Sequence, residues 1–198
     1  MALFGVASEA MVTRPVGLRP PSLLPSMLIL TLRLIHILSG IFWLGSAAIA
    51  AYFLFPALRA TGPSASPFMY QLMERQKLSV AVSVAMALSI LSGFALYGWF
   101  SAVTHGEFAR SRMAMVLGVG AILSIVAAGV AGAVSSPTSR KLRALSEQLQ
   151  VAQRGGGAPP AEMVAELTRL RDKMSRAQSA IAALLILAAS TMAIARYV

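Results

Sequence analysis

The chain contains two histidines, His36 and His105, and no cysteine. Metal or cofactor chemistry would therefore rest on imidazole groups, because thiolate ligands and thiol nucleophiles are excluded. His36 lies within a long apolar segment, whereas His105 lies in a short polar segment after the next apolar one. A neutral imidazole is an ordinary ligand of haem iron and of transition metals. The two histidines are thus the first candidates for a binding site.

In a helix, His36 shares one face with Arg33, Gly40 and Trp43, because residues three or four positions apart are neighbours. Gly40 leaves room for a flat ligand one turn from the imidazole, and Trp43 could pack on that ligand. Arg33 could pair with a propionate at the membrane interface. The pattern therefore indicates a candidate haem b site formed by His36, Arg33, Gly40 and Trp43.

Two other interpretations of the histidines remain open. A copper or zinc ion could bind His36 and His105, although two ligands are too few for a closed site. Met27 and Met113 could add soft ligands for Cu(I), but methionine also fills gaps in ordinary cores. Alternatively, His36 forms a hydrogen bond to a neighbouring helix and His105 is an exposed loop residue.

The composition indicates which elements must position these residues. Of the 198 residues, 57% are hydrophobic and 12% are charged, about half the charged share of soluble domains, which excludes a water-soluble or disordered chain. Four unalternating apolar segments are each long enough to cross a bilayer as a helix: 28–55, 78–100, 113–134 and 177–194. We expect an all-α, integral membrane four-helix bundle.

The apolar segments favour packing over catalysis. Their interiors lack the Asp, Glu, Lys and Arg side chains that a proton-coupled transporter needs. Small residues four apart, such as Ala114 with Gly118 and Ala128 with Gly132, are typical of close helix contacts. Ser89 and Gly93 in the second segment belong to the same class. The sequence also lacks a nucleophile elbow, a zincin motif and a phosphate-binding loop, so we do not expect an autonomous enzyme.

Two motifs carry a resemblance to known membrane proteins. The first is RLIHILSGIFWLG at 33–45, which leads to FPAL at 55–58, and the second is LSGFALY at 91–97. Over about a third of the chain, these motifs resemble small bacterial membrane proteins related to the copper-resistance protein CopD and to HemJ-type protoporphyrinogen oxidase. The resemblance implies an all-helical, multi-spanning fold in the bacterial inner membrane. It also implies a role for His36 in binding haem or in handling a metal.

The net charge of +10 predicts the orientation of the chain in the membrane. With four spans, eleven of the 17 Lys and Arg residues fall in the first and third loops, and six fall on the opposite side. The positive-inside rule then places these two loops in the cytoplasm and both termini outside. We expect no nucleic-acid partner, because the charge has no supporting motif.

The segment 138–176 is predicted to be a cytoplasmic helical hairpin that extends the third and fourth helices as an antiparallel coiled coil. Two apolar stripes have heptad-like spacing: Leu142, Leu145, Leu149 and Ala152, then Met163, Leu167, Leu170 and Met174. Pro137 is expected to kink the third helix where it leaves the membrane. The hairpin either ties two helices together or docks a partner subunit or anionic lipid headgroups. The second interpretation rests on a basic cluster: Arg140, Lys141, Arg143, Arg169, Arg171, Lys173 and Arg176.

Residues 1–26 form a proline-interrupted segment that does not resemble a cleavable secretory signal, and we expect a surface arm there, before a membrane domain at 27–198. Two functions remain. The chain could bind haem b or a metal through His36 for redox or metal handling. Alternatively, it is a non-catalytic accessory subunit, or a homo-oligomer, that assembles with a larger respiratory or photosynthetic membrane complex through its small-residue faces, arm and hairpin.

Overall fold

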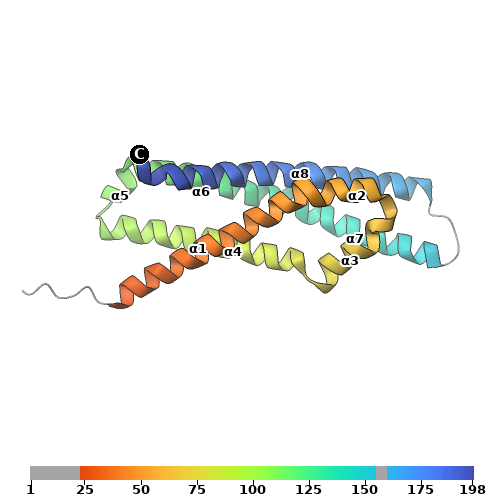
Figure 1. Cartoon of the computed structure of the whole chain (residues 1–198), viewed down its shortest axis with the longest axis horizontal. Coiled ribbons are helices and arrows are strands. Elements are labelled where there is room, and N and C mark those ends of the chain that lie inside the picture. The colour runs from red at the N-terminus through yellow and green to blue at the C-terminus, as the bar shows by residue number, and fades with distance from the viewer. Residues whose placement is uncertain (1–22, 155–159) are drawn as a thin grey trace, which may run out of the picture.

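A computed structural model of the chain describes residues 23–154 and 160–198, and all of its regular elements in these ranges are helical. Residues 23–26 of the expected surface arm belong to the first helix of the structure. The rest of that arm, residues 1–22, and the tip of the expected hairpin, residues 155–159, lie outside the described residues. Four long helices run roughly along one axis of an elongated molecule (Figure 1). They are α1 (Leu23–Ile49), α4 (Leu78–Val103), α6 (Arg112–Val130) and α8 (Ala161–Ile194).

Shorter elements connect or extend these helices. In chain order they are the π-helix η1 (Ala50–Leu54), α2 (Phe55–Thr61), the 3-10 helix η2 (Gly62–Ala65), α3 (Ser66–Tyr70), the π-helix η3 (Gln71–Arg75), α5 (Glu107–Arg110), the π-helix η4 (Ala131–Ser135), α7 (Ser136–Arg154) and the 3-10 helix η5 (Ala195–Tyr197).

Four helical stretches are long and apolar enough to cross a membrane, which confirms the multi-pass, all-helical prediction. They extend over Ser26–Thr61, Leu78–Val103, Arg112–Leu149 and Ala161–Tyr197. Within each apolar window at most 28% of the residues are buried, so most of the apolar side chains face outward. Outward-facing apolar side chains are what a helix needs when its solvent is lipid. The chain is therefore an integral membrane protein.

The third stretch changes its winding just before Pro137, where a kink was expected. The π-helix η4 lies between α6 and α7, and the Ser136 hydroxyl donates a hydrogen bond to the Ala131 carbonyl at 3.1 Å. A proline ring clashes with the carbonyl of the preceding turn, and a π-turn makes room by widening the helix. The helix continues into α7 without a break.

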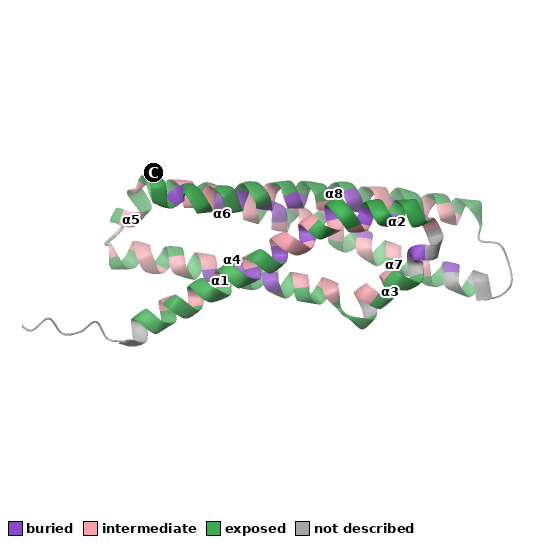
Figure 2. Ribbon diagram, in the orientation of Figure 1, coloured by how far each residue is buried: buried purple, intermediate pink, exposed green. Residues whose placement is uncertain are grey.

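The helices form two close pairs, α1 with α4 and α6 with α8, and the pairs meet near the middle of the molecule. Trp43 is buried there among small side chains from all four long helices, including Ala85, Ala127 and Ala182. Figure 2 shows the buried positions gathered where the helices cross, with exposed positions over the outer faces. Because alanine side chains are small, the backbones of the four helices can approach one another closely around the indole of Trp43.

The segment after α1, residues 50–70, packs against the helical hairpin formed by α7 and the first half of α8. Together they form a second apolar cluster. Phe55, Leu58 and Ala65 pack against Met174 of α8, and Leu142 of α7 borders them. Polar contacts reinforce this docking. Arg59 forms a half-exposed ion pair with Asp172 at 2.9 Å, and the Arg171 guanidinium donates a hydrogen bond to the Gly62 carbonyl at 3.0 Å.

The hairpin helices α7 and α8 both exist, so the predicted extension of the third and fourth helices is confirmed. Leu149, Leu167 and Leu170 of the predicted apolar stripes are buried. Leu142 and Met174 instead contribute to the cluster around Phe55. The stripes are therefore shared between the hairpin and the segment after α1, and the coiled-coil geometry stays a prediction.

Truncation of Leu58 tests this docking. Leu58→Ala is expected to lower the free energy of unfolding by about 2–5 kcal/mol, because Leu58 is 4% exposed and its removal leaves a cavity. Thermal unfolding in detergent, followed by the fluorescence of the two tryptophans, Trp43 and Trp99, measures the effect. Phe53→Ala is the matched control, since Phe53 is 71% exposed on the neighbouring turn. Equal destabilisation by both variants would show that the cluster does not hold the segment.

Candidate functional site

The His36 imidazole forms a hydrogen bond between two membrane helices. Its Nδ1 lies 2.8 Å from the backbone carbonyl oxygen of Ser89 in α4. A carbonyl oxygen only accepts hydrogen bonds, so Nδ1 carries the hydrogen and donates it. In the neutral ring, Nε2 then holds the lone pair. The contact thus fixes both the orientation of the ring and the nitrogen that can bind a ligand.

A notch at Gly93 receives the imidazole ring. A methyl group placed on Gly93 would lie 2.9 Å from the Cε1 atom and 3.2 Å from the Nδ1 atom of His36. The same crossing has a second close approach, because a methyl group on Gly40 would lie 3.3 Å from the Ser89 hydroxyl oxygen. Each helix therefore offers a glycine to the polar side chain of the other. This arrangement brings the two backbones close together around His36.

Arg33 lies beside an aromatic cluster near the ends of α1 and α4. Its guanidinium carbon is 5.3 Å from the centre of the Phe100 ring, which is within the range of a cation–π interaction. Phe108 of α5 packs against Phe100 at 5.6 Å and against Tyr97 at 5.4 Å between ring centres. The short helix α5 thus covers this end of α4.

The structure places the four predicted cofactor residues on one face of α1, and each of them contacts other parts of the protein. Gly40 lies against Ser89, and Trp43 is 3% exposed in the four-helix core. The space expected for a flat ligand between Gly40 and Trp43 is therefore occupied by α4 and the core. His36 itself is half-buried between α1 and α4.

The structure does not bring His36 and His105 together. His105 is exposed in the turn after α4, where its backbone has a φ of +50°. Val103 at the end of α4 is ten residues beyond Gly93, about 15 Å further along the helix axis. Within residues 23–154 and 160–198, no group of three His, Asp or Glu side chains is close enough to hold a metal ion. Met27 and Met113 are both exposed.

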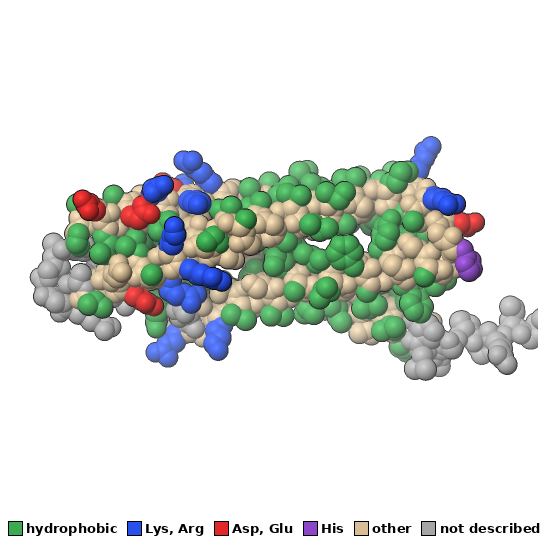
Figure 3. All heavy atoms as spheres, turned by 180° about the vertical axis from the view of Figure 1, so that it is seen from behind, with side chains coloured by type: hydrophobic (Ala, Val, Ile, Leu, Met, Phe, Trp, Pro, Cys, Tyr) green, Lys and Arg blue, Asp and Glu red, His purple; other side chains and the backbone are tan. Residues whose placement is uncertain are grey.

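The predicted basic cluster gathers at the opposite end of the molecule from His105. Figure 3 shows Lys and Arg side chains concentrated around one end, with a smaller group at the other. Arg140, Lys141, Arg143, Arg169, Lys173 and Arg176 lie on the surface or in its grooves. Arg171 differs, because it is half-buried against Gly62 and desolvation lowers the pKa of its guanidinium.

Two features of this arrangement were absent from the sequence-based prediction. Ser89 and Gly93 were recognised only as small packing residues, although they form the receptor for His36. The sequence-based prediction also did not include the docking of the segment after α1 onto the helical hairpin. The apolar Phe55 and Leu58 beside the basic Arg59 were the available signal. No family model matches the sequence, and comparisons with curated proteins and with solved structures find no significant match.

Substitution of Gly93 tests the notch. Gly93→Ala is expected to lower the free energy of unfolding by about 1–3 kcal/mol, because the new methyl group must displace a ring that is fixed by its hydrogen bond to Ser89. Thermal unfolding in detergent measures the change.

The control lies on the same helix. A methyl group on Gly98 meets no atom within 4 Å, so Gly98→Ala should be neutral or stabilising by up to about 1 kcal/mol. In a double-mutant cycle, His36→Ala should remove most of the cost of Gly93→Ala, because the clashing ring is gone. Additive effects would contradict the packing of His36 into this notch.

Proposed function

We propose that this multi-pass membrane protein binds haem b through the Nε2 atom of His36. The observation that carries the proposal is the hydrogen bond from Nδ1 to the Ser89 carbonyl at 2.8 Å. Histidines that bind metals commonly donate their other ring hydrogen to a carbonyl or carboxylate, which fixes the tautomer and makes the ligand more basic. The resemblance of residues 33–45 and 91–97 to CopD-related and HemJ-type proteins supports the same assignment.

Of the predicted residues, His36 could hold the haem iron, whereas the slot expected beside Gly40 and Trp43 is filled. Nε2 holds the lone pair on a half-buried ring, whereas the space beside Gly40 and Trp43 is filled. A haem held by His36 would therefore not use the slot expected beside Gly40 and Trp43. Arg33, one turn from His36, could pair with a propionate without leaving the interface. Bound haem would supply one-electron redox chemistry, and His36 would be the residue that holds its iron.

The lone imidazole of His36 also favours haem over a simple metal ion. Within the described residues, the carboxylates and His105 do not gather around His36 as a metal site requires. Porphyrin nitrogens supply four ligands themselves, so one imidazole from this chain is sufficient for attachment.

A second candidate function is that of a non-catalytic accessory subunit. It is favoured by the filled slot, since Trp43 and Gly40 serve helix packing, and by the wide outward-facing apolar surfaces. In this alternative, His36 is a structural hydrogen-bond donor. The hairpin, held in place by the docked segment after α1, would then offer its charged surface to a larger membrane complex.

Visible absorption distinguishes the two functions. When the chain is expressed with ample haem precursor and purified in mild detergent, we expect a Soret band in the wild type. His36→Ala should lose the band, whereas His105→Ala should keep it, because His105 is an exposed turn residue. A colourless wild type under these conditions would refute the haem proposal and leave the accessory role.

A cavity variant separates loss of a ligand from loss of the fold. His36→Gly removes the imidazole, and added free imidazole should restore the Soret band only if His36 is the iron ligand. A band in His36→Gly before imidazole is added would place the ligand elsewhere in the chain.

We also propose that the hairpin end faces the cytoplasm of a bacterial inner membrane and that both termini face outward. The distribution of basic residues supports this orientation, because eleven of 17 lie in the two loops at the hairpin end.

Single-cysteine labelling tests the orientation, and the natural absence of cysteine makes the background clean. Ala109→Cys in α5 should react with a membrane-impermeant maleimide in intact spheroplasts. Gln148→Cys in α7 should react only after lysis, although both side chains are exposed. The reverse pattern would invert the topology.

A further inference from the structure

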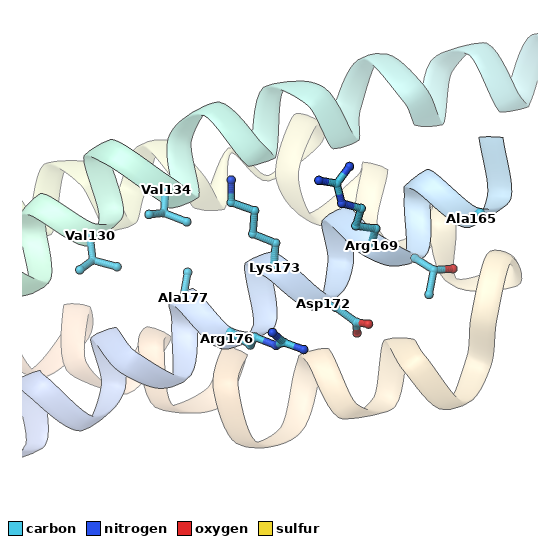
Figure 4. A pocket seen from close by; sticks show the side chains of 9 residues that line it. Val130, Val134, Ala165, Arg169, Asp172, Lys173, Arg176 and Ala177 are labelled. Carbon is cyan, nitrogen blue, oxygen red and sulfur yellow. The ribbon is translucent and has the colours of Figure 1, made fainter. Parts of the chain in front are cut away.

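A groove lies between α8 and the continuous helix formed by α6, η4 and α7. It has a volume of about 710 Å³, which is in the range of small-ligand sites. Figure 4 shows the lining side chains projecting from α8 and from the facing helix. The groove is lined by Val130, Val134, Ala165, Thr168, Arg169, Asp172, Lys173, Arg176 and Ala177.

One end of the groove is apolar and the other is cationic. Val130, Val134 and Ala177 line the apolar end, whereas Arg169 and Lys173 line the polar end. Residues 113–139 and 177–195 contain no Asp, Glu, Lys or Arg, so the groove lies where the uncharged lengths of both helices end. Lys173 is one helical turn, about 6 Å, from Ala177. The groove therefore crosses the boundary between the hydrocarbon core and the headgroup region.

The positive charge of the groove is not neutralised by its single lining carboxylate. Asp172 is already paired with Arg59 at 2.9 Å, and Figure 4 shows it on the side of α8 away from Lys173. Among the described residues, Arg169 forms an exposed ion pair with Glu166 at 3.3 Å. Over residues 23–154 and 160–198, Lys173 makes no ion pair. Lys173 and Arg169 both extend toward the facing helix, across the groove (Figure 4).

We propose that this groove binds an anionic phospholipid, independently of any role of His36. Arg169 and Lys173 bind the phosphodiester, since a guanidinium offers paired donors and an ammonium a compact charge. One acyl chain lies along Val130, Val134 and Ala177 toward the bilayer interior. Charge complementarity selects an anionic headgroup such as phosphatidylglycerol over a zwitterionic one. The apolar end selects a lipid over a free phosphate ester.

Native mass spectrometry of the full-length protein in detergent tests the site, with phosphatidylglycerol and phosphatidylcholine as probes. The wild type should retain one phosphatidylglycerol in preference to phosphatidylcholine. Arg169→Gln with Lys173→Gln should weaken this binding roughly 25-fold, because each basic residue near anionic lipid contributes roughly fivefold. Both side chains are exposed, so the variant should unfold at the wild-type temperature.

The control is Arg140→Gln with Lys141→Gln, which removes the same charge from an exposed part of α7 outside the groove. It should retain phosphatidylglycerol like the wild type. Equal loss in both double variants would overturn the proposal in favour of diffuse surface attraction. Displacement of the lipid by an equal concentration of glycerol phosphate would also overturn it, because the site would then recognise the phosphate alone.

Discussion

The hydrogen bond from His36 to the Ser89 carbonyl sets the crossing of α1 and α4, and much of the remaining architecture depends on that crossing. The bond forms only if the imidazole enters the notch at Gly93, so it requires the two backbones to be close at one depth. Two turns further along α1, Trp43 then lies where all four helices meet. Lipid gives membrane helices no hydrophobic driving force to associate. One polar contact within a close-packed notch can therefore specify the register of two helices, which apolar side chains alone would not determine.

At the hairpin end, where most of the Lys and Arg side chains gather, different interactions hold the chain. The segment after α1 would be an exposed connection if hydropathy alone decided its course. Instead, Phe55 and Leu58 bury against Met174, and the pair of Arg59 with Asp172 fixes the direction of approach. A half-exposed ion pair contributes little free energy by itself, so the apolar cluster supplies the stability and the charges supply the alignment. The hairpin is thereby anchored to α1 and α2 as well as to its own membrane helices.

The four spans could be predicted because hydropathy is local in sequence, and each apolar run becomes a helix whatever its partners are. The partners themselves depend on pairing between distant residues. His36, Gly40 and Trp43 were correctly placed on one face of a helix, but one sequence cannot reveal that α4 covers that face. Close approach on α6 falls at Ala114, Gly120 and Ala127. A methyl group placed on Gly118 of α6 or on Gly132 of η4 would instead meet no atom within 4 Å. Spacing identified the small residues, but the neighbouring helix α8 determines which of them are in contact.

The same geometry explains why the structural and ligand-binding interpretations of His36 are compatible. Helix packing uses the Nδ1 edge of the ring and the Gly93 notch, whereas iron coordination would use Nε2. A ligand at Nε2 withdraws electron density from the ring and strengthens the hydrogen bond that Nδ1 donates. Coordination would therefore tighten the contact between α1 and α4. Arg33 and Trp43 lie on either side of His36 along α1, so any shift of that helix would reach both the interface and the four-helix core.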